Sequence, residues 1–332
     1  GGASQGLKGA GFRVIAGVEN DPHAATTYRQ NHPETHLVED DIRQVRPTHV
    51  MKQVGLSLGE LALLKSCPPC QPFSSLSRRS QLGSLEFLRD TTLSWVRAFR
   101  PRAVLIENVP GVITAPGFAG LWSGLRKSGY SPFSRVLKAE LYGIPQTRRR
   151  WFAVAFRSDT EAMDADSLFA PPPPSRARRQ ADAARALAAL PAASLSSRDP
   201  LHRPRLCPPI VNQRIAAIPP GADRFSLPDD LLLSCHLGLG RNATGPYGRI
   251  PCEGPGPTIT TRCTTPSSGR FIHPNQDRPI TLREAATLQT FPRSYRFSGT
   301  RNQIERQIGN AVPIRLIQLL GKRLYAHLRR AF

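Results

Sequence analysis

Two short segments of the chain carry side chains that can react together. In residues 66–74, with the sequence SCPPCQPFS, Cys70 follows two prolines, which hold the backbone rigid where the thiol must point. Glu107 comes directly after the apolar run Ala103–Ile106. A carboxyl at the mouth of a buried strand is partly desolvated, which favours its neutral form and keeps a proton available. The pair predicts a nucleophile and an acid. Both groups are required when a nucleophile adds to an unactivated pyrimidine ring.

Each of these segments has a simpler explanation when it is taken alone. Cys67 and Cys70 form a C-x-x-C pair, which also occurs in thiol oxidoreductases and in half of a zinc site. The sequence contains no second C-x-x-C, and no His-x-x-x-His follows this pair along the chain, so we predict no metal site. Glu107 and Asn108 also suit the cap of a following helix. Only the combination of the two segments favours catalysis.

A basic segment follows a Pro-Gln turn and leads into another apolar run. Gln146 is followed by Thr147 and by three consecutive arginines, 148–150, ahead of the run Trp151–Phe156. Alternate residues of a strand share a face, so we expect Arg148 and Arg150 to point into one pocket and Arg149 to point away. Arginines placed in this way can hold a carbonyl oxygen and a phosphate. The alternative is a solvated basic run.

Alternating apolar runs and helical segments must position these side chains. Short runs predict strands at Val14–Val18, Leu61–Leu64, Ala103–Ile106, Val136-Leu137 and Trp151–Phe156. Strands that alternate with helices are typical of an α/β fold with a mostly parallel, doubly wound sheet. Such a sheet binds its ligand across the carboxyl ends of the strands.

The pattern changes after the four prolines at 171–174. Residues 178–190 predict an Ala-rich helix, residues 200–277 are irregular and rich in Pro, Gly, Thr and Arg, and 314–328 predict an amphipathic helix. We therefore predict a sheet domain over 1–156, a smaller irregular domain over 157–295 and a C-terminal segment, 296–332, that returns to the first domain. A disordered linker is the alternative for the irregular region.

Composition and charge narrow the choice of partner. The chain has 332 residues with 45 Lys and Arg against 24 Asp and Glu, a formal net charge of +21. An excess of this size favours a polyanion such as nucleic acid, although codon bias also raises the Arg content. The six cysteines indicate reduced thiols in a cytoplasm. The sequence shows no signal peptide and no apolar run of membrane-spanning length, so we expect no membrane partner.

With these segments taken in order, the sequence resembles the DNA cytosine-5 methyltransferases. The motifs that carry the resemblance are Gly1-Gly2 with Gly6-Leu7, Val18-Glu19-Asn20-Asp21, Asp41-Ile42, Pro68-Pro69-Cys70-Gln71-Pro72-Phe73-Ser74, Glu107-Asn108-Val109, Gln146 to Arg150, Arg278 to Pro292, and Gln307 to Pro313. They occur in the family's order and frame nearly the whole chain except about residues 157–245.

The resemblance implies a Rossmann-like methyltransferase sheet, a target-recognition domain, S-adenosylmethionine as cofactor and double-stranded DNA as substrate. A monomer with a cognate restriction endonuclease as functional partner is expected. The implied catalytic residues are Cys70, Glu107, Arg148 and Arg150. The implied cofactor-binding residues are Gly1, Gly2, Glu19, Asn20, Asp41, Ile42, Pro69, Leu88, Asn310 and Val312. The implied DNA contacts are Gln71, Ser74, Asn108, Gln146, Arg249 and Arg262.

The resemblance also assigns steps to these residues. The Cys70 thiolate is expected to add to C6 of a flipped-out cytosine, Glu107 to donate to or share a proton with N3, and Arg150 with Arg148 to steady O2. Glu19 is expected to bind both ribose hydroxyls of the cofactor, and Asp41 its adenine amino group.

Two departures from the family pattern qualify this reading. The family's cofactor loop usually starts with a strand and Asp-Leu-Phe-Ala-Gly ahead of the Gly pair, whereas this chain starts at Gly1. We interpret the chain as a fragment that lacks the first strand, and expect it to bind S-adenosylmethionine poorly. Of the family's Asp-x-Arg-x-x-Leu pattern, Leu88 alone is recognisable.

Three alternatives remain open at this point. They are a catalytically impaired DNA-binding fragment of the same family, an RNA cytosine-5 methyltransferase, and a thiol oxidoreductase built on Cys67 and Cys70. The Cys-Phe-Thr signature of the tRNA-type relatives is absent from the sequence.

Overall fold

The chain divides into two compact units. The computed structural model describes residues 1–67, 81–234 and 245–330. The sheet unit comprises Gly6–Lys138, Arg149–Ala170 and Gln318–Phe332, and the loop-rich unit comprises Gly1–Gln5, Ala139–Arg148 and Pro171–Ile317. These units cross the domain limits expected at 156/157 and 295/296, so that division stays a prediction.

Two sheets form the centre of the sheet unit. Strands β1 (Ala16–Val18) and β2 (His36–Val38) make a parallel pair. The larger sheet has the order β3-β4-β6-β5, with strands at Leu63–Ser66, Ala103–Asn108, Arg149–Arg157 and Tyr130–Lys138. The pair β3–β4 is parallel, whereas β4–β6 and β5–β6 are antiparallel.

The expectation of a mostly parallel sheet is therefore wrong for β5 and β6. Parallel neighbours need a long crossover, usually a helix. The link from β5 to β6 contains only the 3-10 helix η2 (Ala139–Tyr142) and a turn in which Gly143 has a φ of +75°. A link of this kind returns the chain beside the strand that it has just left, so β6 runs back along β5.

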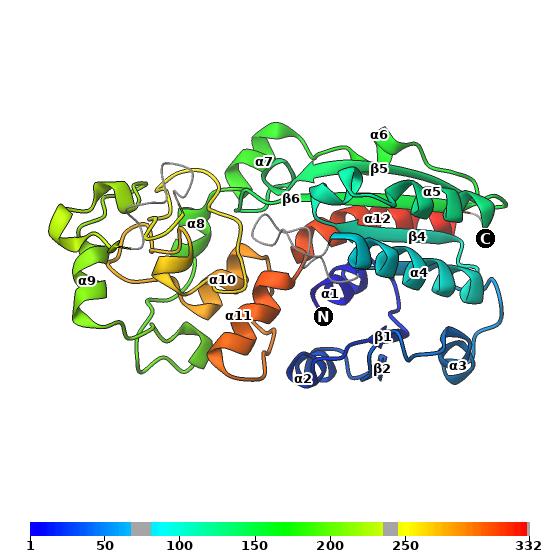
Figure 1. Ribbon diagram of the computed structural model, residues 1–332, viewed down its shortest axis with the longest axis horizontal. Helices are drawn as coiled ribbons and strands as arrows, with labels where there is room; N and C mark the ends of the chain where they lie inside the picture. The colour runs from blue at the N-terminus through cyan, green and yellow to red at the C-terminus, as the bar shows by residue number, and fades with distance from the viewer. Residues whose placement is uncertain (68–80, 235–244, 331–332) are drawn as a thin grey trace. The chain divides into compact units, whose positions relative to one another are not determined.

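Helices cover both faces of the larger sheet (Figure 1). On one face, α4 (Gln81–Phe99) and α5 (Phe118–Lys127) pack through Leu88 and Leu121 on a core that includes Ile106. On the other, α12 (Ile314–Arg329) places the His327 ring 5.2 Å from the ring of Phe156. Successive strand residues face opposite sides, so a strand buried by both layers is apolar throughout, as 103–106 and 151–156 are. This three-layer α/β arrangement is the predicted fold class.

Shorter helices complete the sheet unit. They are α1 (Gly2–Lys8, which begins in the loop-rich unit), α2 (Pro22–Asn31), α3 (Pro47–Gln53), η1 (Pro110–Thr114) and α6 (Ala165–Phe169). The α2 helix starts where Asp21 accepts hydrogen bonds from the backbone N–H groups of His23 and Ala24, because an N-cap carboxylate satisfies the free donors of the first turn.

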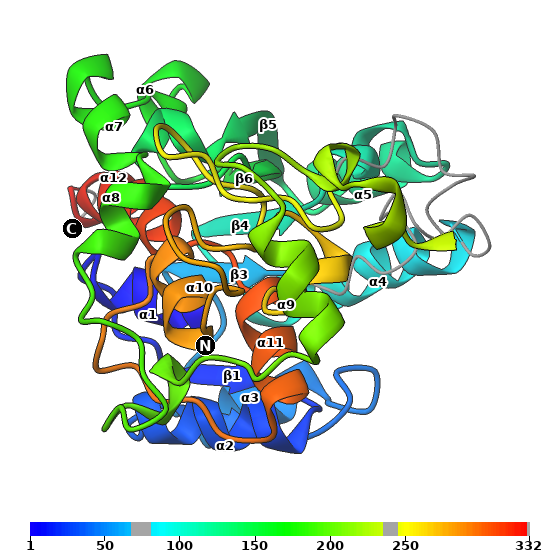
Figure 2. The same cartoon turned by 90° about the vertical axis from the view of Figure 1, so that its left-hand side faces the viewer.

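The loop-rich unit holds short helices joined by long irregular segments, as predicted. Its helices are α7 (Pro174–Gln180), α8 (Ala183–Ala188), η3 (Pro200–His202), α9 (Pro209–Ala216), η4 (Arg224–Ser226), η5 (Asp229–Leu231), η7 (Pro266–Ser268), α10 (Leu282–Leu288) and α11 (Arg301–Asn310). The α10 and α11 helices lie side by side (Figure 2) and share a core with Ile259 and Phe271. The single helix predicted over 178–190 is wrong, because Asp182 caps α8 and separates it from α7.

Within the described ranges, no helix combines the length and the apolar composition that crossing a bilayer requires.

Candidate catalytic site

Strand register places Glu107 between two neighbouring side chains. In the parallel pair, Ser66 lies opposite Ile106, so Cys67 follows β3 beside Glu107 on β4. In the antiparallel pair, Glu107 lies opposite Phe152. Arg150 is two residues from Phe152 and therefore shares its face, as a diagonal neighbour of Glu107.

The Glu107 carboxylate is held at both oxygens. Arg150 Nε lies 3.2 Å from Glu107 Oε1, and Cys67 Sγ donates to Oε2 at 3.1 Å. The side chains of Glu107 and Arg150 keep only 8% and 18% of their exposed area, so the charge pair is poorly screened by water. The structure therefore brings together the predicted acid Glu107 and the predicted Arg150.

Cys67 is in the thiol form beside this carboxylate. The residue as a whole is half-buried, but its sulfur is packed deeply enough that desolvation raises the pKa of the Cys67 thiol, and Glu107 raises it further. Lys65 lowers the pKa of this thiol, with an effect smaller than that of desolvation. A neutral thiol can donate one hydrogen bond. Sequence reasoning missed this contact because it treated Cys67 as one half of a C-x-x-C pair.

Four of the predicted site residues, Pro69, Cys70, Gln71 and Ser74, lie outside the described residues. Their assigned roles stay predictions.

Arg148 and Arg150 have different partners. The expectation that both point into one pocket is therefore wrong. Arg148 is 2% exposed, and its Nη1 and Nη2 donate to the backbone carbonyls of Ile259 at 2.8 Å and Gly309 at 3.0 Å. The expected alternation fails because β6 begins at Arg149, so Arg148 precedes the strand. Arg149 is exposed, as expected.

Gln146 belongs to the same buried network of the loop-rich unit. Its Nε2 donates to the Leu288 carbonyl at 2.8 Å and to Gln289 Oε1 at 2.9 Å, and its Oε1 accepts from Ile259 N–H. Gln289 in turn donates to the carbonyls of Ile308 and Ala311. Gln146 is fully buried, and a side chain without exposed surface cannot contact DNA in this conformation. The predicted DNA contact is replaced by a positioning role.

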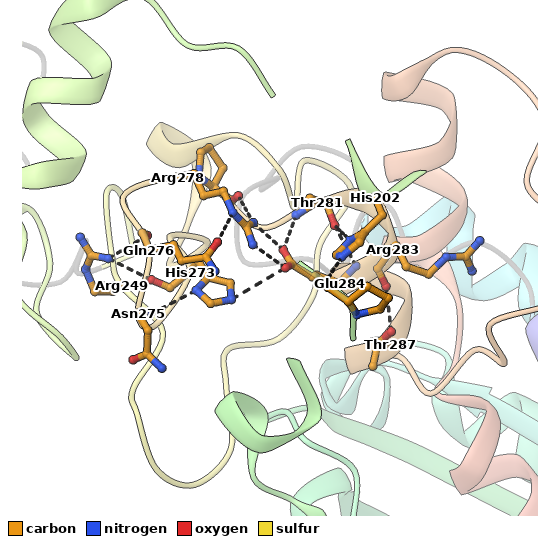
Figure 3. A network of polar contacts seen from close by, with 12 residues as sticks. His202, Arg249, His273, Asn275, Gln276, Arg278, Thr281, Arg283, Glu284 and Thr287 are labelled. Atoms are coloured by element: carbon orange, nitrogen blue, oxygen red, sulfur yellow. Dashed lines mark hydrogen bonds and ion pairs between the residues drawn. The ribbon is translucent and has the colours of Figure 1, made fainter. Parts of the chain in front are cut away.

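Arg249 is another predicted DNA contact that proves to be buried. It is 4% exposed and donates to the carbonyls of Ile218, His273, Gln276 and Ile215 and to Asp277. Figure 3 shows it beside a polar cluster in which Arg278 binds Glu284 through two hydrogen bonds of 2.7 and 2.8 Å. Five donors in a rigid fork suit a guanidinium for collecting carbonyls that irregular backbone leaves unpaired. Arg249 thus organises loops in place of β-sheet hydrogen bonds.

The other DNA predictions divide by exposure. Asn108 ends β4, is 1% exposed and accepts a hydrogen bond from Val109 N–H at 2.8 Å, so its side chain has almost no surface for a DNA contact in this conformation. Arg262 is exposed. Among the predicted DNA contacts that the structure describes, it alone presents its side chain to solvent.

The two predicted cofactor acids lie at one edge of the β1–β2 pair. Glu19 directly follows β1, and Asp41 follows β2 after a short turn. Val18 lies opposite Val38, so both acids stand at the carboxyl ends of parallel strands. Asn20 is exposed beside Glu19, and Ile42 packs in the apolar cluster under these strands. The positions are those expected, and the binding roles stay predictions.

Both acids already have hydrogen-bond partners. Glu19 Oε1 accepts from Asp21 N–H at 3.1 Å. Asp41 accepts from Arg43 through both carboxylate oxygens, which lowers the pKa of Asp41 to about 2. A ligand amino group at Asp41 would therefore compete with Arg43.

In the loop-rich unit, residues from the two ends of the chain meet. A Cβ placed on Gly2 would lie in van der Waals contact, 3.4 Å from the Val312 carbonyl oxygen and from the Ala311 side chain, so these residues are direct neighbours. Val312 is 6% exposed, whereas Gly1 and Asn310 are exposed. The structure thus brings the predicted cofactor residues Gly2 and Val312 together.

Leu88 is the predicted cofactor residue that the structure places elsewhere. It is 1% exposed and packs in the core between α4 and the sheet. Its side chain has no surface to offer a ligand, so we assign it to packing.

Comparisons with known proteins match most of the chain to one protein family. The model of the C-5 cytosine-specific DNA methylase family matches residues 1–199 and 241–326. The chain is 34% identical over 338 residues to the Type II methylase M.HgiDII of Herpetosiphon aurantiacus, covering 97% of this chain and 91% of that one. It is 33% identical over 346 residues to the Type II methyltransferase M.PspPI of Psychrobacter sp., covering all of this chain and 78% of that one.

Solved structures show the same fold. The crystal structure of a candidate DNA modification methyltransferase encoded within an E. coli prophage superposes with a TM-score of 0.75 at 24% identity and covers 99% of this chain and 97% of that chain. The family match spans most of the chain, and relatives above 30% identity span nearly all of it. The chain therefore belongs to the C-5 cytosine-specific DNA methylase family.

Proposed function

We propose that the protein methylates C5 of a cytosine in double-stranded DNA, with S-adenosylmethionine as methyl donor and a covalent adduct at Cys70. The observation that carries this proposal is the Glu107 carboxylate, anchored at the end of β4 by Arg150 in a chain that matches the family over most of its length. The Type II names of the relatives support a modification enzyme that works beside a restriction endonuclease.

The residues at the edge of the β1–β2 pair fit the proposed cofactor. Glu19 offers carboxylate oxygens for two ribose hydroxyls, and Asp41 offers an acceptor for an adenine amino group once Arg43 has turned away. Gly2 and Val312, which are neighbours within the loop-rich unit, are also proposed as cofactor-binding residues. When bound there, S-adenosylmethionine supplies the methyl group.

The protein groups perform the remaining chemistry on the cytosine. The base is turned out of the duplex, which costs roughly a few kcal/mol, because neither ring face is reachable within the stack. The Cys70 thiolate forms a bond to C6, and the C5–C6 electron pair moves toward C5. A hydrogen bond or proton from Glu107 at N3 limits the negative charge on the ring. After methyl transfer, loss of the C5 proton and cleavage of the sulfur–C6 bond release 5-methylcytosine and restore the thiolate.

Arg150 acts on this chemistry through Glu107. Its Nε contact fixes one carboxylate oxygen and directs the acid from a rigid strand. The further contact of Arg150 with the cytosine O2 stays part of the proposal, whereas Arg148 acts as a positioning residue of the loop-rich unit.

Methyl transfer from labelled S-adenosylmethionine to duplex DNA tests the proposal. We expect Cys70→Ser to abolish transfer, because a hydroxyl does not match a thiolate as nucleophile at neutral pH, while DNA binding persists. The matched control is Cys252→Ser, which alters an exposed free thiol and leaves transfer unchanged. Duplex DNA with 5-fluorocytosine at the target is expected to give a denaturation-resistant adduct with the wild-type chain only. Methyl transfer by Cys70→Ser at the wild-type rate would overturn the mechanism.

We also propose that the irregular domain, 157–295, selects the target sequence. The family model leaves the residues between 199 and 241 unmatched, which supports a segment that varies while the catalytic framework is kept. Arg262 is exposed there and is suited to a phosphate or a base edge.

A further inference from the structure

The Glu107 carboxylate accepts a hydrogen bond from a thiol that has no assigned role in the reaction. Cys67 comes directly after β3. The last pair of the β3–β4 ladder is Ser66 with Ile106, so the next residues, Cys67 and Glu107, lie side by side. The Sγ–Oε2 distance of 3.1 Å is short for a sulfur donor. Arg150 contacts Oε1, and among the residues that the structure describes the Cys67 thiol is the hydrogen-bond partner of Oε2.

The groups that face this carboxylate define its electrostatics. Among the described residues they are Arg150 from β6, Cys67 from the end of β3, and Lys65, which interacts with the Cys67 thiol. Arg150 carries a full positive charge, whereas burial raises the pKa of Cys67 so that it keeps its proton at neutral pH. The thiol is therefore a permanent, neutral donor.

We propose that Cys67 is a positioning residue for Glu107: its S–H group donates to Oε2 and fixes the orientation of the carboxyl group. A carboxylate that accepts two hydrogen bonds at fixed angles presents its remaining lone pairs in one direction. Without the thiol, Oε2 would lose its donor in a poorly hydrated place, and the protonated acid would become easier to form. The consequence for catalysis rests on the proposed role of Glu107 as the acid at N3.

Three substitutions of Cys67 separate hydrogen bonding from packing. Cys67→Ser keeps a donor, Cys67→Val keeps the approximate volume without a donor, and Cys67→Ala removes both. The first measurement is the titration of the Glu107 carboxyl by infrared or ¹³C NMR spectroscopy in the full chain without DNA, assigned by its absence in Glu107→Gln. The second is the pH profile of kcat for methyl transfer to duplex DNA.

We expect the carboxyl of Cys67→Val and Cys67→Ala to ionise about 0.5 to 1 pH unit higher than in the wild type, as the loss of one hydrogen bond predicts. The alkaline limb of the kcat profile should move upward by the same amount, because the acid stays protonated to higher pH. Cys67→Ser should titrate close to the wild type.

Two results would overturn the proposal. One is an unchanged carboxyl titration in Cys67→Val and Cys67→Ala, and the other is a shift in Cys67→Ser as large as that in Cys67→Val. Should a variant fail to fold, the S–H stretching band of Cys67 in the wild-type protein is measured in its place. A band that has the same frequency in Glu107→Leu as in the wild type would contradict the hydrogen bond. Failure of the proposed function has a different signature, which is a wild-type chain without methyl transfer whose carboxyl titration still responds to Cys67.

Discussion

Replacing Arg148 separates a structural role from a catalytic one. Arg148 is 2% exposed, and its guanidinium donates two hydrogen bonds to the carbonyls of Ile259 and Gly309. Arg148→Met fills a similar volume but leaves both carbonyls without these donors. Each hydrogen bond to a charged group contributes about 1.5 to 3 kcal/mol, and removing the buried charge offsets part of the loss. We therefore expect the free energy of unfolding to fall by about 2 to 4 kcal/mol.

Urea unfolding followed by circular dichroism measures this loss, with Arg149→Met as the matched control. Arg149 is the exposed neighbour, so its replacement removes the same charge at a solvated position and should change the free energy of unfolding by less than about 0.5 kcal/mol. Two units in one chain can unfold in separate steps, so the two variants are compared transition by transition. An Arg148→Met chain that unfolds at the wild-type urea concentration, yet transfers methyl groups a hundred times more slowly, would show that Arg148 contacts the substrate.

Three further predictions follow from the site and the loop-rich unit. Glu107→Gln should lower the single-turnover rate of methyl transfer by about 10²-fold or more while changing cofactor affinity little. Equal losses of rate and of cofactor affinity would indicate that Glu107 has a structural role. Exchanging residues 200–265 with the matching region of a relative of different specificity should transfer that specificity, and sequencing of methylated sites shows whether it does. Burial lowers the pKa of His273 to about 4, so the unfolded chain binds a proton first on acidification and stability should fall from about pH 6.5 to pH 4. His273→Gln should flatten urea-midpoint curves in that range, and an unchanged slope would contradict this origin.

The sequence alone was enough to identify the family and the main layers of the fold. Cys70 after two prolines and Glu107 after an apolar run are local sequence patterns, and the order of the motifs placed the chain in a family. Strands at 103–106 and 151–156 and the final amphipathic helix were predictable because both faces of a central strand, or one face of a covering helix, must be apolar.

Only the tertiary structure decided which polar side chains meet. Residue type and alternation predict the face of a strand but not the register of its neighbour, and the β3–β4 and β4–β6 registers are what bring Cys67 and Arg150 to Glu107. For the same reason the roles of Gln146 and Arg249 could not be read from the sequence. Polar side chains suit DNA and buried backbone carbonyls equally well, and the choice depends on whether distant loops cover them, which is a property of the folded chain.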